Sequence, residues 1–193
     1  AVWNGGDREY LLTATVSGRL NMIDPAKGKL LWAIEGLGEN HFSLTPTAEH
    51  VFVNVGSKHP RDEGDSRMFG RLGAYAISTA GAKRVWEHPD EPNYLIPTWM
   101  DSCARRRLTA RDGCVYYLVS GKEKRVRRRI VKLDENTGEI LAEFPSPSSA
   151  PQFYLVENRL LVIPDASHGD SITMALLETE NLKQLADFWK PPH

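Results

Sequence analysis

The sequence RLNMIDPAKGKLLW, residues 19–32, decides the fold of this chain. Apolar positions alternate with polar ones on either side of its centre, which is the pattern of a half-buried β-strand. The centre, residues 24–28, contains a proline, which presets φ, and a glycine, which accepts a positive φ. The stretch therefore predicts a β-hairpin.

The same template returns along the chain. Residues 129–142 match it without gaps, and Asp134 and Gly138 take the places of the turn aspartate and glycine. A copy with one extra residue spans residues 72–86, and a degenerate copy has Ala186 in place of the final tryptophan. Repeats of roughly 40 to 55 residues, each one β unit, predict a β-propeller or a related array.

These residues also carry a family resemblance. Residues 22–32 resemble the tryptophan-docking motif of the pyrroloquinoline-quinone-like β-propeller repeats, which runs roughly Ala-x-Asp-x-x-Thr-Gly-x-x-x-Trp. Residues 132–142 are similar and retain the Thr-Gly pair, whereas the second copy has Ser-Thr-Ala-Gly, residues 78–81, in place of the aspartate turn. The copies replace the small alanine or the tryptophan of the motif at Met22, Lys132, Ala142 and Ala186.

The resemblance implies an all-β fold, with one propeller segment over residues 1–193. We expect about four four-stranded blades, with approximate bounds at residues 1–37, 38–91, 92–148 and 149–193. Propellers of this family have about seven or eight blades, so we expect the chain to be part of a larger ring. A closed four-bladed ring and a dimer of two half rings are the alternatives.

The motif residues are predicted to hold blades together, because repeat units need neighbours to bury their faces. We expect the tryptophans to pack against the adjacent blade and the aspartates and glycines to set the hairpins. The predicted blade-docking residues are Asp24, Gly28, Trp32, Gly81, Trp86, Asp134 and Gly138. A role for Trp32 as a stacking platform for a quinone conflicts with its outer position, because the cofactor of quinoproteins lies on the central axis.

The composition is that of an ordinary globular protein. The chain has 193 residues, 41% hydrophobic content and a formal net charge of −1, so no global field predicts a nucleic acid or an anionic membrane as partner. The basic run at residues 122–129 is interrupted by Glu123 and is interpreted as a solvated loop. No apolar run approaches the roughly 18 residues of a membrane span. Cys103 and Cys114 are too few for a disulfide scaffold or a zinc site, and a bond between them is not the default expectation.

The resemblance also raises an enzyme hypothesis. Quinone-dependent dehydrogenases hold calcium beside the quinone, use an aspartate as base, and many carry two adjacent cysteines against the cofactor. This chain has no Cys-Cys pair, none of its aspartates stands in a motif of a base, and its histidines lack ligand spacing. We therefore predict no catalytic residue, no metal and no cofactor; pyrroloquinoline quinone and calcium are expected only if the chain is part of such an enzyme.

The predicted function is a non-catalytic scaffold or binding module. Three loops, at residues 57–67, 121–129 and 164–171, are expected on one face of the propeller, and the candidate contact residues on that face are His59, Arg61, Lys122, Arg125, Asp165 and His168. The resemblance implies a larger bacterial protein that is periplasmic or secreted, although the first residues show no signal segment. The partner is expected to be a protein or a small molecule, the remaining blades, or a second copy. The alternative is part of a quinone-dependent alcohol or sugar dehydrogenase.

Overall fold

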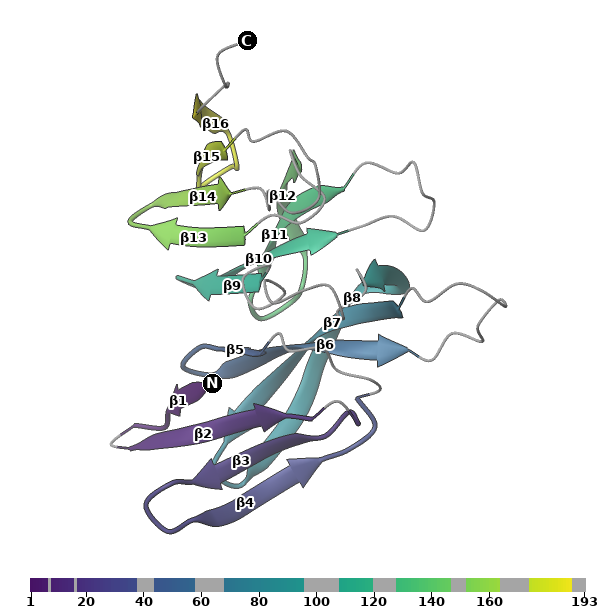
Figure 1. Ribbon diagram of the computed structural model, residues 1–193, viewed down its shortest axis with the longest axis vertical. Helices are drawn as coiled ribbons and strands as arrows, with labels where there is room; N and C mark the ends of the chain where they lie inside the picture. The colour runs from purple at the N-terminus through teal and green to yellow at the C-terminus, as the bar shows by residue number, and fades with distance from the viewer. Residues whose placement is uncertain are drawn as a thin grey trace. The chain divides into compact units, whose positions relative to one another are not determined.

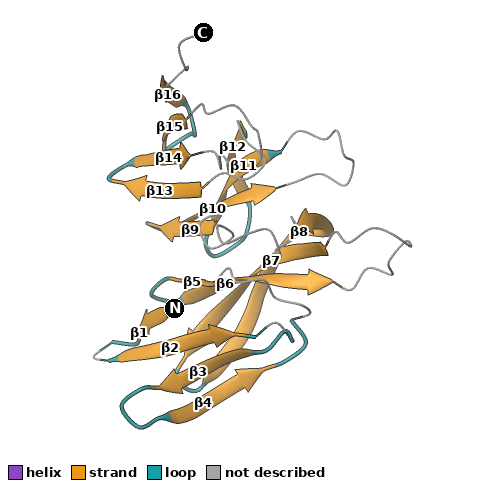
Figure 2. Cartoon of the chain, in the orientation of Figure 1, coloured by secondary structure: helices purple, strands orange, loops and turns teal. Residues whose placement is uncertain are grey.

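The computed structural model describes residues 1–6, 8–15, 17–37, 44–57, 68–95, 108–119, 128–146, 152–163 and 174–188. Within these ranges the chain consists of strands, turns and loops, and Figure 2 shows no helix among them. The strands form four four-stranded sheets (Figure 1). The predicted all-β class with about four four-stranded blades is therefore confirmed.

Each sheet is an antiparallel meander in which strands pair in chain order, and we number these sheets as blades 1 to 4. Blade 1 comprises β1 (Val2–Asn4), β2 (Glu9–Ala14), β3 (Leu20–Asp24) and β4 (Lys29–Ile34). Blade 2 comprises β5 (Leu44–Pro46), β6 (His50–Ser57), β7 (Met68–Ser78) and β8 (Gly81–Leu95). Blade 3 comprises β9 (Leu108–Arg111), β10 (Cys114–Val119), β11 (Arg129–Asp134) and β12 (Ile140–Pro145). Blade 4 comprises β13 (Gln152–Val156), β14 (Arg159–Ile163), β15 (Met174–Glu178) and β16 (Gln184–Phe188).

The chain divides into two compact units. The first contains Ala1–Met100 together with the turn Glu135–Gly138, and the second contains Asp101–Asp134 and Glu139–His193. Blades 1 and 2 therefore belong to the first unit, and the strands of blades 3 and 4 belong to the second. The turn that joins β11 to β12 is counted with the first unit because its contacts lie there.

The last hairpin of every blade carries a β-bulge at the same register. The pairing shifts after Met22, Ala74, Lys132 and Leu176, which occupy one position of the repeat. Each shift leaves one aliphatic residue of the outer strand without a cross-strand partner, and these residues are Leu31, Val85, Leu141 and Leu185. A bulge bends the strand and increases its twist. In the sequence template, the fixed number of residues between the turn and the tryptophan includes this bulged residue.

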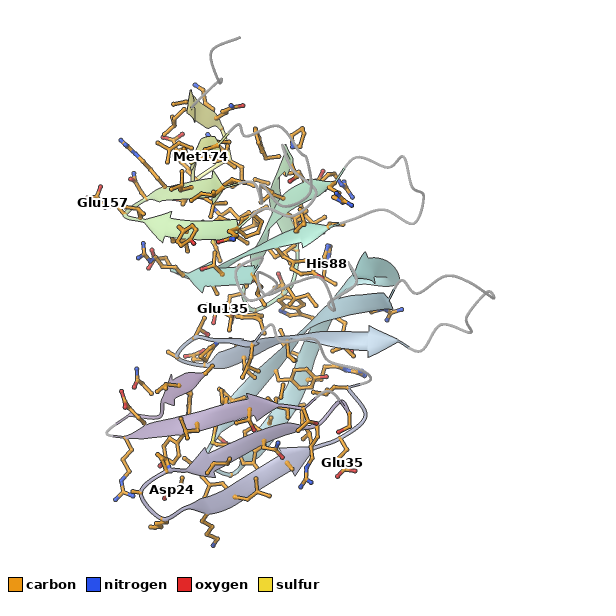
Figure 3. The ribbon with its side chains drawn as sticks, viewed as in Figure 1. Asp24, Glu35, His88, Glu135, Glu157 and Met174 are labelled. Carbon is orange, nitrogen blue, oxygen red and sulfur yellow. The ribbon has the colours of Figure 1, made fainter. Side chains whose placement is uncertain are left out.

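Side chains stabilise the hairpin turns through hydrogen bonds to nearby backbone groups. Asp24, which is buried, accepts hydrogen bonds at Oδ1 from the backbone N–H groups of Ala26 and Lys27, at 3.0 and 3.2 Å. Ser78 takes this role in blade 2, because its Oγ accepts from the N–H of Ala80 at 3.2 Å. Such side-chain to backbone bonds explain why aspartate and serine favour turns. Figure 3 labels Asp24 at the turn between β3 and β4.

The turn glycines of blades 1 and 3 adopt the left-handed conformation, and the turn of blade 4 does so without glycine. Gly28 has a φ of +60° and Gly138 a φ of +73°. The matching position of blade 4 is Leu182, with a φ of 57° and a side chain that is only 1% exposed. Burial of this leucine offsets the strain of a positive φ, which costs roughly 1–2 kcal/mol.

Each unit has a core between its blades. In the first unit the cluster combines Leu12, Leu20 and Met22 of blade 1 with Val51 and Val53 of blade 2. In the second unit the fully buried aliphatic residues come from both blades and include Val115, Ile130, Leu133, Leu160 and Val162. Among the described residues no helix is long and apolar enough to cross a membrane.

Candidate functional site: the junctions between repeats

Indole groups join the repeats in the first unit. Trp32 Nε1 on β4 donates a hydrogen bond to the carbonyl of Ser78 at 2.8 Å, at the turn between β7 and β8. Trp3 Nε1 on β1 donates to the carbonyl of Ala48 at 3.0 Å, at the turn between β5 and β6. Both bonds run from blade 1 to a hairpin turn of blade 2. A tryptophan thus packs its ring and satisfies its only donor at the same junction.

Trp86 makes the same kind of junction with the turn Glu135–Gly138. Its Nε1 on β8 donates to the carbonyl of Glu135 at 2.9 Å. Its ring lies against Gly138, where an added Cβ would come within 2.7 Å of the indole. Glycine at this position therefore meets two demands, because it takes the positive φ and leaves room for the ring.

A buried polar cluster lies at the same turn. His50 Nδ1 donates to Glu135 Oε1 at 3.0 Å, and the hydroxyl of Thr47 donates to the same oxygen. His50 is 6% exposed and Glu135 is 9% exposed. Hydrogen bonds to a buried carboxylate are the condition for burying it at modest cost. The cluster therefore fixes the turn from within, and its burial keeps it from a dissolved substrate.

The second unit uses cations in place of indoles. Lys132 Nζ on β11 donates to the carbonyl of Glu180 at 2.9 Å, at the turn between β15 and β16. Arg111 Nη1 donates to the carbonyl of Glu157 at 2.8 Å, at the turn between β13 and β14; Figure 3 labels Glu157 at this turn. Lys132 is the cross-strand partner of Ala142, which stands where blade 1 has Trp32. Lys132 therefore donates a hydrogen bond to the next blade at the point of the repeat where blade 1 uses the indole of Trp32.

A cavity of about 180 Å³ lies at this junction between blades 3 and 4. Blade 3 contributes the polar side chains of Arg111, Asp112, Cys114, Tyr116 and Lys132, and blade 4 contributes Leu155 and the polar residues Glu157, Asn158, Glu178, Thr179 and Glu180. The volume is below the roughly 300–1,000 Å³ of typical ligand sites. The cavity is thus a small, mixed-charge gap in the junction.

Tyr116 is one of the residues that line this gap. Its ring is buried, and its hydroxyl donates to the carbonyl of Thr179 at 3.4 Å. Burial is the main cause that raises the pKa of Tyr116 from 10.0 to about 12, and the neighbouring Cys114 thiol adds to the effect. The phenol therefore stays neutral and remains a donor at any physiological pH.

The predicted site residues fall into two groups. Trp32, Trp86 and Gly138 lie at the junctions described above, whereas a Cβ at Gly28 or Gly81 would meet no atom within 4 Å. The backbone N–H of Asp134 donates to the carbonyl of Glu139 at 2.9 Å within its own hairpin. The candidate contact residues all lie outside the described residues, namely His59, Arg61, Lys122, Arg125, Asp165 and His168.

The structure describes one of the two cysteines. Cys114 is a half-buried free thiol, and Cys103 lies outside the described residues. No group of three or more His, Cys, Asp or Glu side chains in the described ranges is arranged to hold a metal ion.

Several junction residues were missed at the sequence level. Trp3 precedes the first copy of the template, so no repeat points to it. Thr47 and His50 lie 88 and 85 residues from Glu135, and no spacing rule links them. In the sequence, Lys132 is only a departure from the motif. Its cross-strand pairing with Ala142, which replaces the tryptophan, places a hydrogen-bond donor on the neighbouring strand.

No protein-family model and no curated protein matches the sequence. Solved structures do match it: BamB from Moraxella catarrhalis shares 15% identity at a TM-score of 0.60, over 97% of this chain and 47% of BamB. The quinohemoprotein alcohol dehydrogenase from Comamonas testosteroni shares 13% identity at a TM-score of 0.55, over 95% of this chain and 34% of the enzyme.

The chain has a β-propeller fold. This propeller architecture also accounts for its likeness to the WD40 domain of coronin from Toxoplasma gondii, with 15% identity, a TM-score of 0.60, and coverage of 95% of this chain and 42% of that one. The chain spans less than half the length of each of these structures. Its four meanders are propeller blades, and the indole and lysine bonds are contacts between blades.

Proposed function

We propose that this propeller segment is a non-catalytic scaffold of a larger secreted or cell-envelope protein, and that it presents loops to a protein or small-molecule partner. The observation that supports this most is the use of the repeat's defining side chains. Trp32 and Trp86 each donate to a backbone carbonyl of a following hairpin turn, and Gly138 makes room for the second ring. These residues join repeats to one another, which is the role of a scaffold.

We also propose that this segment binds neither a quinone nor calcium. The cavity between blades 3 and 4 supports this part of the proposal, because its volume of about 180 Å³ is below that of typical cofactor sites and its lining residues carry charges of both signs. In the described ranges no group of three or more His, Cys, Asp or Glu side chains converges, so nothing there supports a calcium site. An extracytoplasmic location is part of the proposal and rests on the family resemblance.

A second candidate function is part of a quinone-dependent alcohol or sugar dehydrogenase. The likeness to the quinohemoprotein alcohol dehydrogenase favours it, since the match extends over 95% of this chain. The chain covers 34% of that enzyme, so it would supply only some of the blades around a cofactor. Other blades would then complete the site.

A titration distinguishes the two candidates. The purified chain is mixed with pyrroloquinoline quinone and calcium, the quinone absorbance is recorded, and reduction of an electron-accepting dye is followed after addition of an alcohol or a sugar. The scaffold proposal predicts no saturable spectral change and no dye reduction. A saturable change that requires calcium, followed by dye reduction, would establish the dehydrogenase reading.

The loop surface is tested by affinity capture with crosslinking. One variant replaces the candidate contact residues His59, Arg61, Lys122, Arg125, Asp165 and His168 with serine. A matched control replaces exposed charged residues of the outer hairpins, Lys29, Lys83, Glu139 and Lys183, also with serine. The proposal predicts that a captured partner is lost with the loop variant and kept with the control. Loss with the control alone would place the contact surface elsewhere.

A further inference from the structure

The two blade junctions that lie inside single units have opposite chemistry. Between blades 1 and 2 the donors are indoles, Trp3 and Trp32, and the junction continues into the apolar cluster that contains Leu12 and Val51. Between blades 3 and 4 the donors are the cations Arg111 and Lys132. In the junction between blades 1 and 2, the donor and acceptor residues of the two bonds are 45 and 46 residues apart in sequence, and in the junction between blades 3 and 4 they are 46 and 48 apart. The two junctions therefore occupy corresponding positions of the repeat.

We propose that the junction between blades 3 and 4 is an opening seam, which separates locally while both blades stay folded. The seam consists of Arg111, Tyr116 and Lys132 on blade 3, and of the hairpin turns at residues 157–158 and 178–180 on blade 4. The junction between blades 1 and 2 stays closed under the same conditions.

The missing tryptophan is the first argument for the seam. Met22 pairs across the hairpin with Trp32 in blade 1, and Lys132 pairs with Ala142 at the same position of blade 3. This exchange keeps one hydrogen bond to the next turn but removes the large ring, which in blade 1 packs against the apolar core cluster. Lys132 and Arg111 donate in solvent-exposed surroundings, where water competes for both donor and acceptor.

The cavity is the second argument. It lies at this junction, and its lining includes Glu157, Glu178 and Glu180 of blade 4 as well as the two cations of blade 3. Atoms that line a gap lack packing partners on one side, so the junction gains less from dispersion than a close-packed one. Charged side chains also regain hydration when the seam opens. Opening therefore costs less here than at an indole junction.

Cys114 is a built-in reporter of opening. It is half-buried, has a free thiol and lines the cavity from the first residue of β10. A seam that opens exposes this thiol without unfolding β10. Opening therefore speeds its alkylation by an uncharged reagent above the rate that the half-buried thiol has in a closed seam.

The test measures the alkylation rate of Cys114 in the full chain, in a Cys103→Ser background so that one thiol reacts, with mass spectrometry of the peptide that contains Cys114. The expected rate is higher than in the variant Lys132→Met, Ala142→Trp, which gives the seam the indole of blade 1. It also rises when ionic strength increases from about 0.01 M to about 1 M, because salt screens the charges across the seam. A rate that does not respond to ionic strength would overturn the proposal.

Variants at the two junctions complete the test. The double variant Lys132→Met, Ala142→Trp gives blade 3 the side chains of blade 1, and alkylation of Cys114 is expected to slow at least about tenfold, which corresponds to ~1.4 kcal/mol. Trp32→Ala, which removes the indole of the other unit, is the control and is expected to leave the rate unchanged. If the first variant fails to fold, the single variant Lys132→Met is used and is expected to speed alkylation. An unchanged rate in a folded Lys132 variant would refute the seam.

Discussion

Replacing Gly138 with alanine tests the packing of a tryptophan on a turn glycine. Gly138 has a φ of +73°, which costs an L-residue roughly 1–2 kcal/mol. A Cβ there would also lie 2.7 Å from the ring of Trp86, and overpacking of this kind costs about 1–3 kcal/mol. Gly138→Ala is therefore expected to lower the free energy of unfolding by about 2–5 kcal/mol.

Gly28 provides the matched control. It has a φ of +60° at the same position of the repeat, but a Cβ there would meet no atom within 4 Å. Gly28→Ala should thus show only the conformational cost of roughly 1–2 kcal/mol. The difference between the two variants isolates the contact with Trp86.

Urea unfolding followed by circular dichroism measures both variants, with the slope against denaturant checked for constancy. A double-mutant cycle with Trp86→Ala reports the coupling directly. The contact predicts that Gly138→Ala costs about 1–3 kcal/mol less in the Trp86→Ala background. Equal destabilisation by Gly28→Ala and Gly138→Ala would refute the reasoning, because the ring would then not press on the turn.

Two further predictions concern buried polar groups. Glu135→Leu removes the acceptor shared by His50 and Thr47 and should destabilise the chain by about 1–3 kcal/mol, whereas Glu135→Gln keeps an acceptor and should cost less. Thermal unfolding of both variants measures which of them is less stable. A less stable Glu135→Gln variant would contradict the cluster. The pKa of Tyr116 is raised by burial from 10.0 to about 12, so the folded state favours the neutral phenol, and the stability that this supplies is present below pH 10 and lost as pH rises toward 12. Denaturant unfolding across this pH range should show a steeper loss in wild type than in Tyr116→Phe, and identical pH profiles would contradict the assigned environment.

The hairpins could be predicted from sequence because their signals are local. Asp24 and Gly28 set a turn through bonds and dihedral angles that involve only their neighbours, and Trp32 stands at a fixed offset from them. The repetition of this pattern gave the number and type of sheets. Even the serine turn of blade 2 carried a local signal, since Ser78 bonds to a backbone N–H as the aspartate does.

The junctions were less predictable because their partners are remote in sequence. The bond from Lys132 to Glu180 replaces an aromatic contact with a cationic one, and a template based on residue identity reads this as decay of the motif. Leu182 is a comparable case: the template shows no glycine, yet the residue keeps the positive φ because burial of its side chain offsets the strain. The contact-face residues lie outside the described residues, so their role stays a prediction.

Hydrogen exchange of the indole N–H protons by NMR is the most direct test of the central claim that tryptophans of the repeat join blades. The account predicts protection for Trp3, Trp32 and Trp86, whose Nε1 protons bond to the carbonyls of Ala48, Ser78 and Glu135. Protection should be stronger for Trp86, whose bond is partly buried, than for Trp32, whose bond is exposed. Exchange of all three protons at the rate of free indole would contradict the account.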